Sequence, residues 1–341
     1  MVRYIIRRSL GIVVILTIIS IITFGIFYLI PANPALQACG KGCNSERLAE
    51  IENKLGLDKP VFLAFPPTDS QYGTFVKGVF AGRDFEGGGS TEHCDRPCLG
   101  YSFATDQPVW PDLLDRLPVT FSIAIGAAIL WLITGVTLGI VSALKRGTIF
   151  DKSAMTFALA GVSLPSYFTG LILLTVFCFT SFGGHDPFFP TPVYSDFTDS
   201  PISWAKNLIL PWITLAFLFA ALYARLTRAN MLETMGEDYI RTARAKGLPE
   251  RTVVGKHGLR AALTPIVTIF GLDLGGLLGG AILTESIYGM PGLGRYALEA
   301  ITKADQPKIL GVTLFAAFFI VVANLVVDVL YAFLDPKVQY S

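Results

Sequence analysis

The sequence has few charged residues and very few histidines, and this scarcity limits the chemistry that the chain could perform. Charged side chains make up 16% of the 341 residues, and the three histidines, His93, His185 and His257, lie far apart in the chain. The zinc-binding pattern H-E-x-x-H and the nucleophile pattern G-x-S-x-G are both absent. The sequence therefore predicts no catalytic residues and argues against an enzyme.

The sequence also lacks a phosphate-binding loop and a strong net charge. No stretch matches G-x-x-x-x-G-K-[ST], the loop that holds the phosphates of ATP. The glycines of "YGMPGLGR" follow an apolar run and indicate a turn. A net charge of +1 argues against nucleic acid as a partner. We expect the chain to bind no cofactor of its own.

Long apolar runs are what the sequence has in abundance. Hydrophobic residues make up 52% of the chain, and they are gathered into blocks. A helix of about 20 apolar residues crosses the hydrocarbon layer of a membrane, and these blocks lack the alternation of barrel strands. We therefore predict an all-α membrane protein with six spanning helices. The runs cover residues 9–30, 118–144, 154–181, 208–231, 262–287 and 309–334.

The basic residues predict the orientation of these spans, because Lys and Arg near helix ends stay in the cytoplasm. Basic residues precede the first run, lie between the second and third runs, and lie between the fourth and fifth. Those before the first run are Arg3, Arg7 and Arg8, and those between the second and third runs are Lys145, Arg146 and Lys152. The connection 182–206 is instead acidic. We predict that both termini are cytoplasmic, and that the first run is a retained helix rather than a signal peptide.

Residues 31–112 form one long connection on the predicted extracellular side, and it holds four of the five cysteines. They form two C-x3-C pairs, Cys39 with Cys43 and Cys94 with Cys98. An even set of cysteines outside the membrane favours disulfides, and four cysteines permit three connectivities. A metal site is the alternative, since His93 adjoins Cys94, but exposed thiolates outside a cell oxidise unless the metal is always present. We therefore assign no metal site.

The fifth run contains candidates for a transport pathway. A carboxylate inside a span costs several kcal/mol, about 2.5–3.5 on insertion scales, unless it faces water or a partner, so Asp273 is the first candidate. Gly275 and Gly279 continue a stripe of small residues that begins at Gly271, and such stripes also allow close packing of helices. Glu285 is expected to close this helix on the outer side, near water.

The stretch "EDYIRTARAKGLPERTVVGKHGLR", residues 237–260, is the most polar in the second half of the chain. Gly247 fits a left-handed helix end and Pro249 fits the first turn of a second helix, which predicts a bent helical elbow within 232–260. Ile240, Ala243 and Gly247 are expected on one side of its first helix, where a partner surface could approach closely. A solvated basic connection, held inside by its charge, is the alternative.

At these residues a family resemblance becomes specific. "EDYIRTARAKGL" followed by "LRAALTPIVT" resembles the cytoplasmic motif of permeases of bacterial ABC importers, in their dipeptide and oligopeptide branch. "GVSLPSYF", "GAILTESIYGMPGLGR" and "VVANLVVDVLYAFLDPKV" resemble the same branch, so the likeness covers nearly the whole chain. The main departure is the Cys- and Gly-rich stretch from about residue 83 to 98.

The resemblance implies a fold and a set of partners. The fold is the six-helix transmembrane domain of a type I ABC importer, with residues 1–30 as the first span, 31–112 as a large extracellular loop and 113–341 as the five-helix core. The partners are a second homologous permease, two ATPase subunits or a two-domain ATPase that use ATP and Mg, an extracellular substrate-binding lipoprotein, and the lipid of the bacterial inner membrane. The residues placed at the ATPase contact are Tyr239, Ala243, Arg244, Ala245, Gly247 and Leu248.

Peptides are the solute that the resemblance favours. Relatives in this branch also handle haem, glutathione or nickel complexes, and the binding protein makes much of the selection. An ion-coupled secondary transporter is a further alternative, but it would be expected to show internal repeats, and none is apparent. A membrane scaffold without transport would not explain the elbow.

Overall fold

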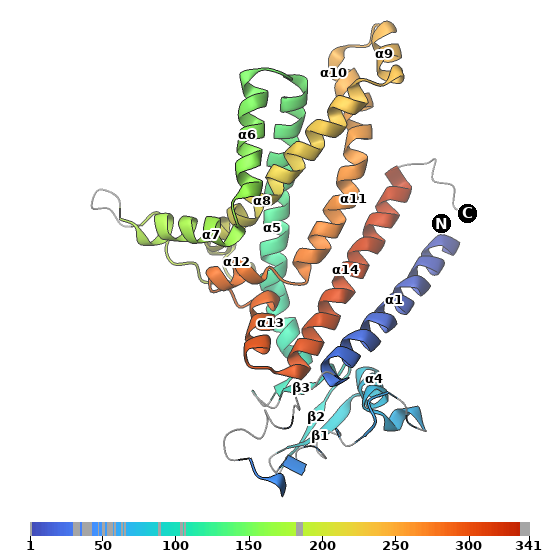
Figure 1. The fold of residues 1–341 in the computed structure, drawn as a ribbon. Coiled ribbons are helices and arrows are strands. Elements are labelled where there is room, and N and C mark those ends of the chain that lie inside the picture. The colour runs from blue at the N-terminus through green and yellow to red at the C-terminus, as the bar shows by residue number, and fades with distance from the viewer. Residues whose placement is uncertain are drawn as a thin grey trace.

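The protein forms a bundle of long helices that carries a small strand-containing region at one end and a helical elbow at the other (Figure 1). The computed structural model describes residues 2–29, 66–87, 90–102, 107–181 and 187–334, together with Thr105 and scattered residues between 35 and 64. Below, these ends are called the strand end and the elbow end. The helical bundle confirms the predicted fold class.

Five long helices within the described residues are apolar enough to cross a membrane. Four of them are single α-helices, and the fifth comprises a short helix, a π-helical segment and α11. They are α1 (Val2–Leu29), α5 (Val109–Leu144), α8 (Pro201–Met235), α10 (Glu250–Thr252) with the π-helical segment Val253–Gly258 and α11 (Leu259–Leu278), and α14 (Gln306–Leu334). The predicted span 118–144 thus lies inside α5. This helix begins at Val109, within residues 31–112, which the sequence assigned to the outer loop.

The third predicted span, 154–181, is not the continuous helix that we expected. It consists of α6 (Ile149–Ser163), α7 (Ser166–Leu174) and the π-helical segment Thr175–Phe179, and it bends by 97° between α6 and α7. Pro165 has no amide hydrogen, and it disfavours the helical conformation of the preceding residue. Leu164 accordingly adopts an extended conformation, with ψ 125°. Counted as one span, this bent pair gives six.

The fifth predicted span, 262–287, is also divided. Helix α11 ends at Leu278, the chain turns through Gly280 at φ +127°, and the short helix α12 (Ile282–Ile287) follows. Helix α13 (Leu293–Thr302) then leads to α14. A side chain at position 280 would meet the backbone of Gly294 at 2.7 Å, so this turn brings α12 and α13 into close contact.

The core of the bundle lies between α5 and α8. Trp131 and Tyr223 are fully buried there, and the Trp131 ring stacks on Phe219. Small residues let the two helices approach closely: a Cβ at Gly135 would lie 2.8 Å from the carbonyl oxygen of Ala220. Helix α1, by contrast, presents many exposed isoleucine and valine side chains, as expected of a helix that faces lipid.

At the strand end, helix α4 (Gln71–Ala81) precedes an antiparallel hairpin of β1 (Arg83–Gly87) and β2 (Ser90–Cys94). A disulfide joins Cys94 to Cys98 directly after β2, which makes the thiol of Cys94 unavailable to a metal beside His93. Cys43 is disulfide-bonded as well, while Cys39 lies outside the described residues. The short strands β3 (Tyr101–Ser102) and β4 (Gln107–Pro108) then lead into α5.

Candidate functional site

The elbow has the helix–glycine–helix geometry that its sequence predicts. Helix α9 (Asp238–Ala245) ends where the amide of Gly247 donates to the carbonyl of Arg244 at 2.9 Å, and Gly247 adopts φ +75°. Pro249 then caps α10, and the π-helical segment Val253–Gly258 continues into α11. The elbow thus connects two spans, and it lies at the far end of the bundle from the strands (Figure 1).

One face of α9 packs against the chain itself, which corrects part of our expectation. Ile240 is fully buried and Ala243 is 7% exposed, and both pack with Val253 and Met235. The sequence had placed Ile240 and Ala243 toward a partner, but these apolar side chains close the elbow from inside. Ala243 therefore supports the elbow surface instead of forming it.

The remaining predicted contact residues form the exposed surface of the elbow. Tyr239 is 46% exposed and Leu248 is 38% exposed, although both carry large apolar groups. Arg244, Ala245 and Gly247 are exposed beside them. Burial, with a smaller effect of the Glu237 carboxylate, raises the pKa of Tyr239, so its phenol remains neutral at physiological pH. The surface thus combines apolar groups with a cationic side chain.

The elbow carries two exposed ion pairs, and one of them joins its two short helices. The Arg244 guanidinium donates two hydrogen bonds to the Glu250 carboxylate, at 2.7 and 3.2 Å. Arg241 pairs with Asp238 on the same helix, α9, at 3.1 Å. Exposed pairs of this kind contribute little to stability. Their effect is to orient Arg244 across the glycine turn.

The glycine stripe of α11 packs against α14 in the same chain. A Cβ at Gly275 would lie 2.7 Å from the Cβ of Ala323, and one at Gly279 would lie 2.9 Å from the Cβ of Ala316. Gly275 and Gly279 therefore serve to pack α11 against α14, and their role as pathway residues stays a prediction. The spacing alone could not separate these two roles.

Asp273 lies on the side of α11 that faces α8. The Tyr223 hydroxyl donates a hydrogen bond of 2.8 Å to its carboxylate, and the Asp273 residue is partly exposed. A carboxylate in a span is expected to find a polar partner or water, and the Tyr223 hydroxyl is such a partner. Asp273 therefore remains a candidate pathway residue, with Tyr223 added to it.

Glu285 is the residue whose environment differs most from its predicted one. It is fully buried, although the sequence placed it at the end of a helix near water. Its carboxylate accepts hydrogen bonds from the hydroxyl of Thr120 (2.8 Å) and from the amides of Arg295 (2.9 Å) and Ala281 (3.2 Å). Because the fifth span breaks at Gly280, Glu285 is turned inward, where it joins α5, α12 and α13.

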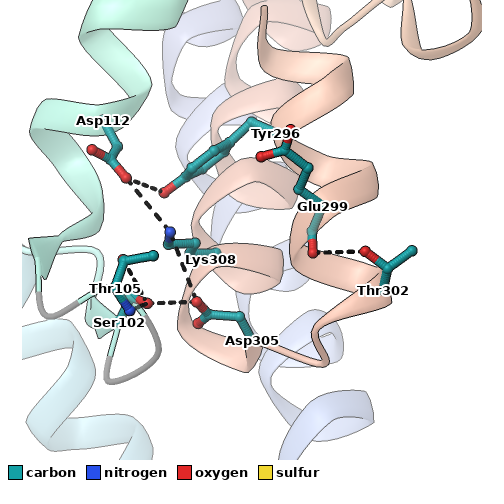
Figure 2. Close-up of polar contacts among 8 residues, drawn as sticks. All are labelled: Ser102, Thr105, Asp112, Tyr296, Glu299, Thr302, Asp305 and Lys308. Carbon is teal, nitrogen blue, oxygen red and sulfur yellow. Dashed lines mark hydrogen bonds and ion pairs between the residues drawn. The ribbon is translucent and has the colours of Figure 1, made fainter. Parts of the chain in front are cut away.

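A polar network that the sequence analysis missed joins α5, α13 and α14 at the strand end. We define it as Ser102, Asp112, Tyr296, Asp305 and Lys308 (Figure 2). The Tyr296 hydroxyl donates to Asp112 at 3.0 Å, and the Ser102 hydroxyl donates to Asp305 at 2.5 Å. The Lys308 ammonium, in a residue that is 7% exposed, lies 3.7 Å from Asp112 and 3.9 Å from Asp305.

Burial raises the pKa of Tyr296 well above its usual range, and the Asp112 carboxylate raises it further. Tyr296 therefore stays a neutral donor. The sequence does contain a signal for this network, because Asp305 and Lys308 stand at i, i+3 at the beginning of an apolar run. Their partner Asp112 lies almost two hundred residues earlier, so the spacing of charges along one helix cannot identify it.

Comparison with known proteins gives matches over the whole length of the chain. Residues 135–340 match the family described as binding-protein-dependent transport system inner membrane component, and residues 1–124 match the N-terminal family of the same membrane components. The dipeptide transport system permease protein DppB of Alkalihalophilus pseudofirmus is 37% identical over 356 aligned positions, and that of Escherichia coli K12 is 35% identical over 361. A putative peptide transport system permease of Brucella abortus is 36% identical over 341. Each match covers 100% of both chains.

Proposed function

The chain belongs to the family of binding-protein-dependent transport system inner membrane components, and on that premise we propose that it is a permease subunit of an ATP-driven importer for short peptides. The proposal includes a pathway shared with a second, homologous permease. It also includes two ATPase subunits at the elbow and a binding protein that delivers the solute at the strand end. Both termini then lie in the cytoplasm.

The exposed elbow is the observation that carries this proposal. Tyr239 and Leu248 present apolar surface at the tip of a structure that is otherwise polar, which is typical of a protein contact. Ile240 and Val253 are fully buried in the elbow and pack with Met235 of α8, so a displacement of the elbow is transmitted to the spans that it connects. A topology anchor would need only the positive charges and no packed core.

Peptides are the solute that the named relatives support, since their names describe peptide and dipeptide transport. The absence of a phosphate-binding loop is consistent with ATP hydrolysis by separate subunits. Haem, glutathione and nickel complexes remain alternative cargoes for the same assembly. Uptake assays with each of these solutes would separate them from peptides.

Substitution of Gly247 by Arg tests the elbow. Gly247 adopts φ +75° with no atom within 4 Å of a Cβ, so the fold accepts a side chain at a cost of about 1 kcal/mol of backbone strain. The long side chain then projects from the proposed docking surface. In proteoliposomes with the assembled transporter, we expect ATP hydrolysis to continue while uptake of the dipeptide Ala-Ala is lost.

Gly147 provides a matched control, because it also has a positive φ, +81°, and open space around its Cβ, but lies outside the elbow. The variant Gly147→Arg carries the same strain and the same added charge, and we expect it to retain coupled uptake. Normal Ala-Ala uptake by Gly247→Arg would count against the assigned role of the elbow. A wild-type complex that imports none of the tested peptides would refute the peptide proposal itself.

A further inference from the structure

A polar pocket opens beside the polar network, where the beginning of α5, helix α13 and the beginning of α14 meet. Its volume is about 140 Å³, and since one water molecule needs about 10–15 Å³ of such space, it has room for a group the size of an amino-acid residue. The pocket has both acidic and basic side chains in its wall. Which of these charges already have partners determines what the pocket can bind.

The acidic side chains of the pocket are already engaged. Asp112 accepts from Tyr296 and faces Lys308, and Asp305 accepts from Ser102 and faces the same ammonium (Figure 2). Glu299 forms an ion pair of 3.0 Å with Arg295, one turn earlier on α13. The carboxylates therefore have little capacity left for an added cation.

Two basic side chains of the pocket have no carboxylate partner among the described residues. The Arg116 guanidinium lies over the Tyr296 ring, 4.5 Å from its centre, which leaves its hydrogen-bond donors without a carboxylate acceptor. Lys303 is exposed at the end of α13 and has no ion pair within the described part of the chain. An arginine held flat by stacking is well oriented to bind a planar carboxylate through two hydrogen bonds.

The backbone at the edge of the pocket is strained. Ala304 has φ +50°, a conformation that residues other than glycine seldom adopt. This turn between α13 and α14 places Lys303 and Asp305 on the wall of one pocket. Strained residues of this kind cluster at binding sites, where the surrounding structure maintains them.

We propose that this pocket binds a carboxylate through Arg116 and Lys303, and that its natural ligand is the C-terminal carboxylate of a peptide entering from the strand end. The inference rests on the proposed function for the identity of the ligand. Three acidic side chains share the wall, and they disfavour a doubly charged phosphate more than a singly charged carboxylate. The pocket then acts as a subsite that receives one end of the solute.

Ligand-observed saturation-transfer NMR can test this inference on the full chain in phosphatidylcholine nanodiscs, without the binding protein. We expect saturation transfer to Ala-Ala, and binding about tenfold weaker or more for its C-terminal amide, because a charged hydrogen bond is lost. The double variant R116Q/K303Q should lose the signal. Lys206→Gln, which removes a positive charge from α8 at a position that does not line this pocket, should retain it.

Because R116Q also removes the stacking on Tyr296, Lys303→Gln alone provides a variant whose fold is not at risk. We expect its binding of Ala-Ala to weaken about threefold or more. Equal signals from Ala-Ala and its amide, or an unchanged signal in the double variant, would overturn the inference. Stronger competition by inorganic phosphate than by acetate would also overturn it. Loss of the signal in nanodiscs that contain phosphatidylglycerol would overturn it as well, because it would indicate that the pocket binds a lipid headgroup.

This test separates the inference from the proposed function. If the assembled transporter imports Ala-Ala while the isolated chain gives no saturation transfer, the pocket proposal fails and the peptide importer stands. If the chain binds Ala-Ala and the assembled transporter does not import peptides, the proposed function fails instead.

Discussion

The elbow and the strand end of the bundle use charged residues in opposite ways. In the elbow, the charges lie close together in sequence, in residues 237–260, and the pairs Arg241–Asp238 and Arg244–Glu250 are largely exposed. At the strand end, Asp112, Glu285, Asp305 and Lys308 come from distant parts of the chain and are mostly buried. Charges that are grouped in the sequence form a surface here, whereas charges scattered among apolar residues form a structural core.

This difference has an energetic consequence. A buried charged group that loses its partner costs several kcal/mol, while an exposed pair contributes little. We therefore expect the strand end to depend on single polar side chains for its stability, and the elbow itself to depend on them for its interactions.

Replacement of Glu285 by Ala should produce the largest loss of stability. The Thr120 hydroxyl and the amides of Ala281 and Arg295 would each be left without their acceptor in a buried site. We expect a loss of about 3 kcal/mol or more. A thiol-reactive dye that reports exposure of Cys178, a buried free cysteine, during thermal unfolding would measure it.

Glu285→Gln is the matched control, because its amide oxygen still accepts part of these hydrogen bonds. Its effect should be clearly smaller than that of Glu285→Ala. If the two variants unfold at the same temperature as the wild type, Glu285 does not hold α12 and α13 against α5, and the contrast between the two ends loses its main example.

Lys308→Met should have the second largest effect. The substitution retains most of the apolar length of the side chain but leaves Asp112 and Asp305 facing each other without a cation. We expect a loss of about 3 kcal/mol in the free energy of unfolding. The additional change Asp305→Asn should restore part of the lost stability, and a further loss in the double variant would contradict the network.

The sequence predicts the helical bundle well because a spanning helix can be recognised from the local composition of a long apolar run alone. It also predicts the turn at Gly247 and the restart at Pro249, since both follow from the conformational preferences of single residues. Local rules are sufficient for these features. Of the residues that the resemblance places at the ATPase contact, Tyr239 and Leu248 are exposed and Ala243 is buried.

The breaks in the third and fifth spans were missed for different reasons. Pro165 is a helix breaker that the sequence shows. The apolar run around it is so long, however, that its mean hydropathy still predicts one continuous span. Gly280 is one glycine among several in the sequence, and only the structure distinguishes it, through its φ of +127° and its close contact with Gly294. The burial of Glu285 follows from that break, so it could not be inferred once the helix was taken as continuous.

Ala304→Gly should produce a small gain at the strand end. The alanine is held at φ +50°, where glycine is unstrained, although glycine loses more backbone freedom on folding. We expect a net stabilisation of a few tenths of a kcal/mol, roughly 0.5 at most. A lower unfolding temperature in this variant would show that the alanine methyl group makes a contact worth more than the strain.

Arg244→Gln should produce no measurable change in unfolding temperature, although it breaks two hydrogen bonds to Glu250. Arg244→Gln removes one positive charge, as Lys308→Met does. The Arg244–Glu250 pair is exposed, however, so water replaces the guanidinium as the partner of Glu250. We nevertheless expect reduced coupling of ATP hydrolysis to Ala-Ala uptake in proteoliposomes, because Arg244 lies on the proposed docking surface. Arg241→Gln, on the same helix and paired with Asp238, serves as the control. A marked loss of stability in Arg244→Gln would mean that the elbow, like the strand end, depends on its ion pairs for folding.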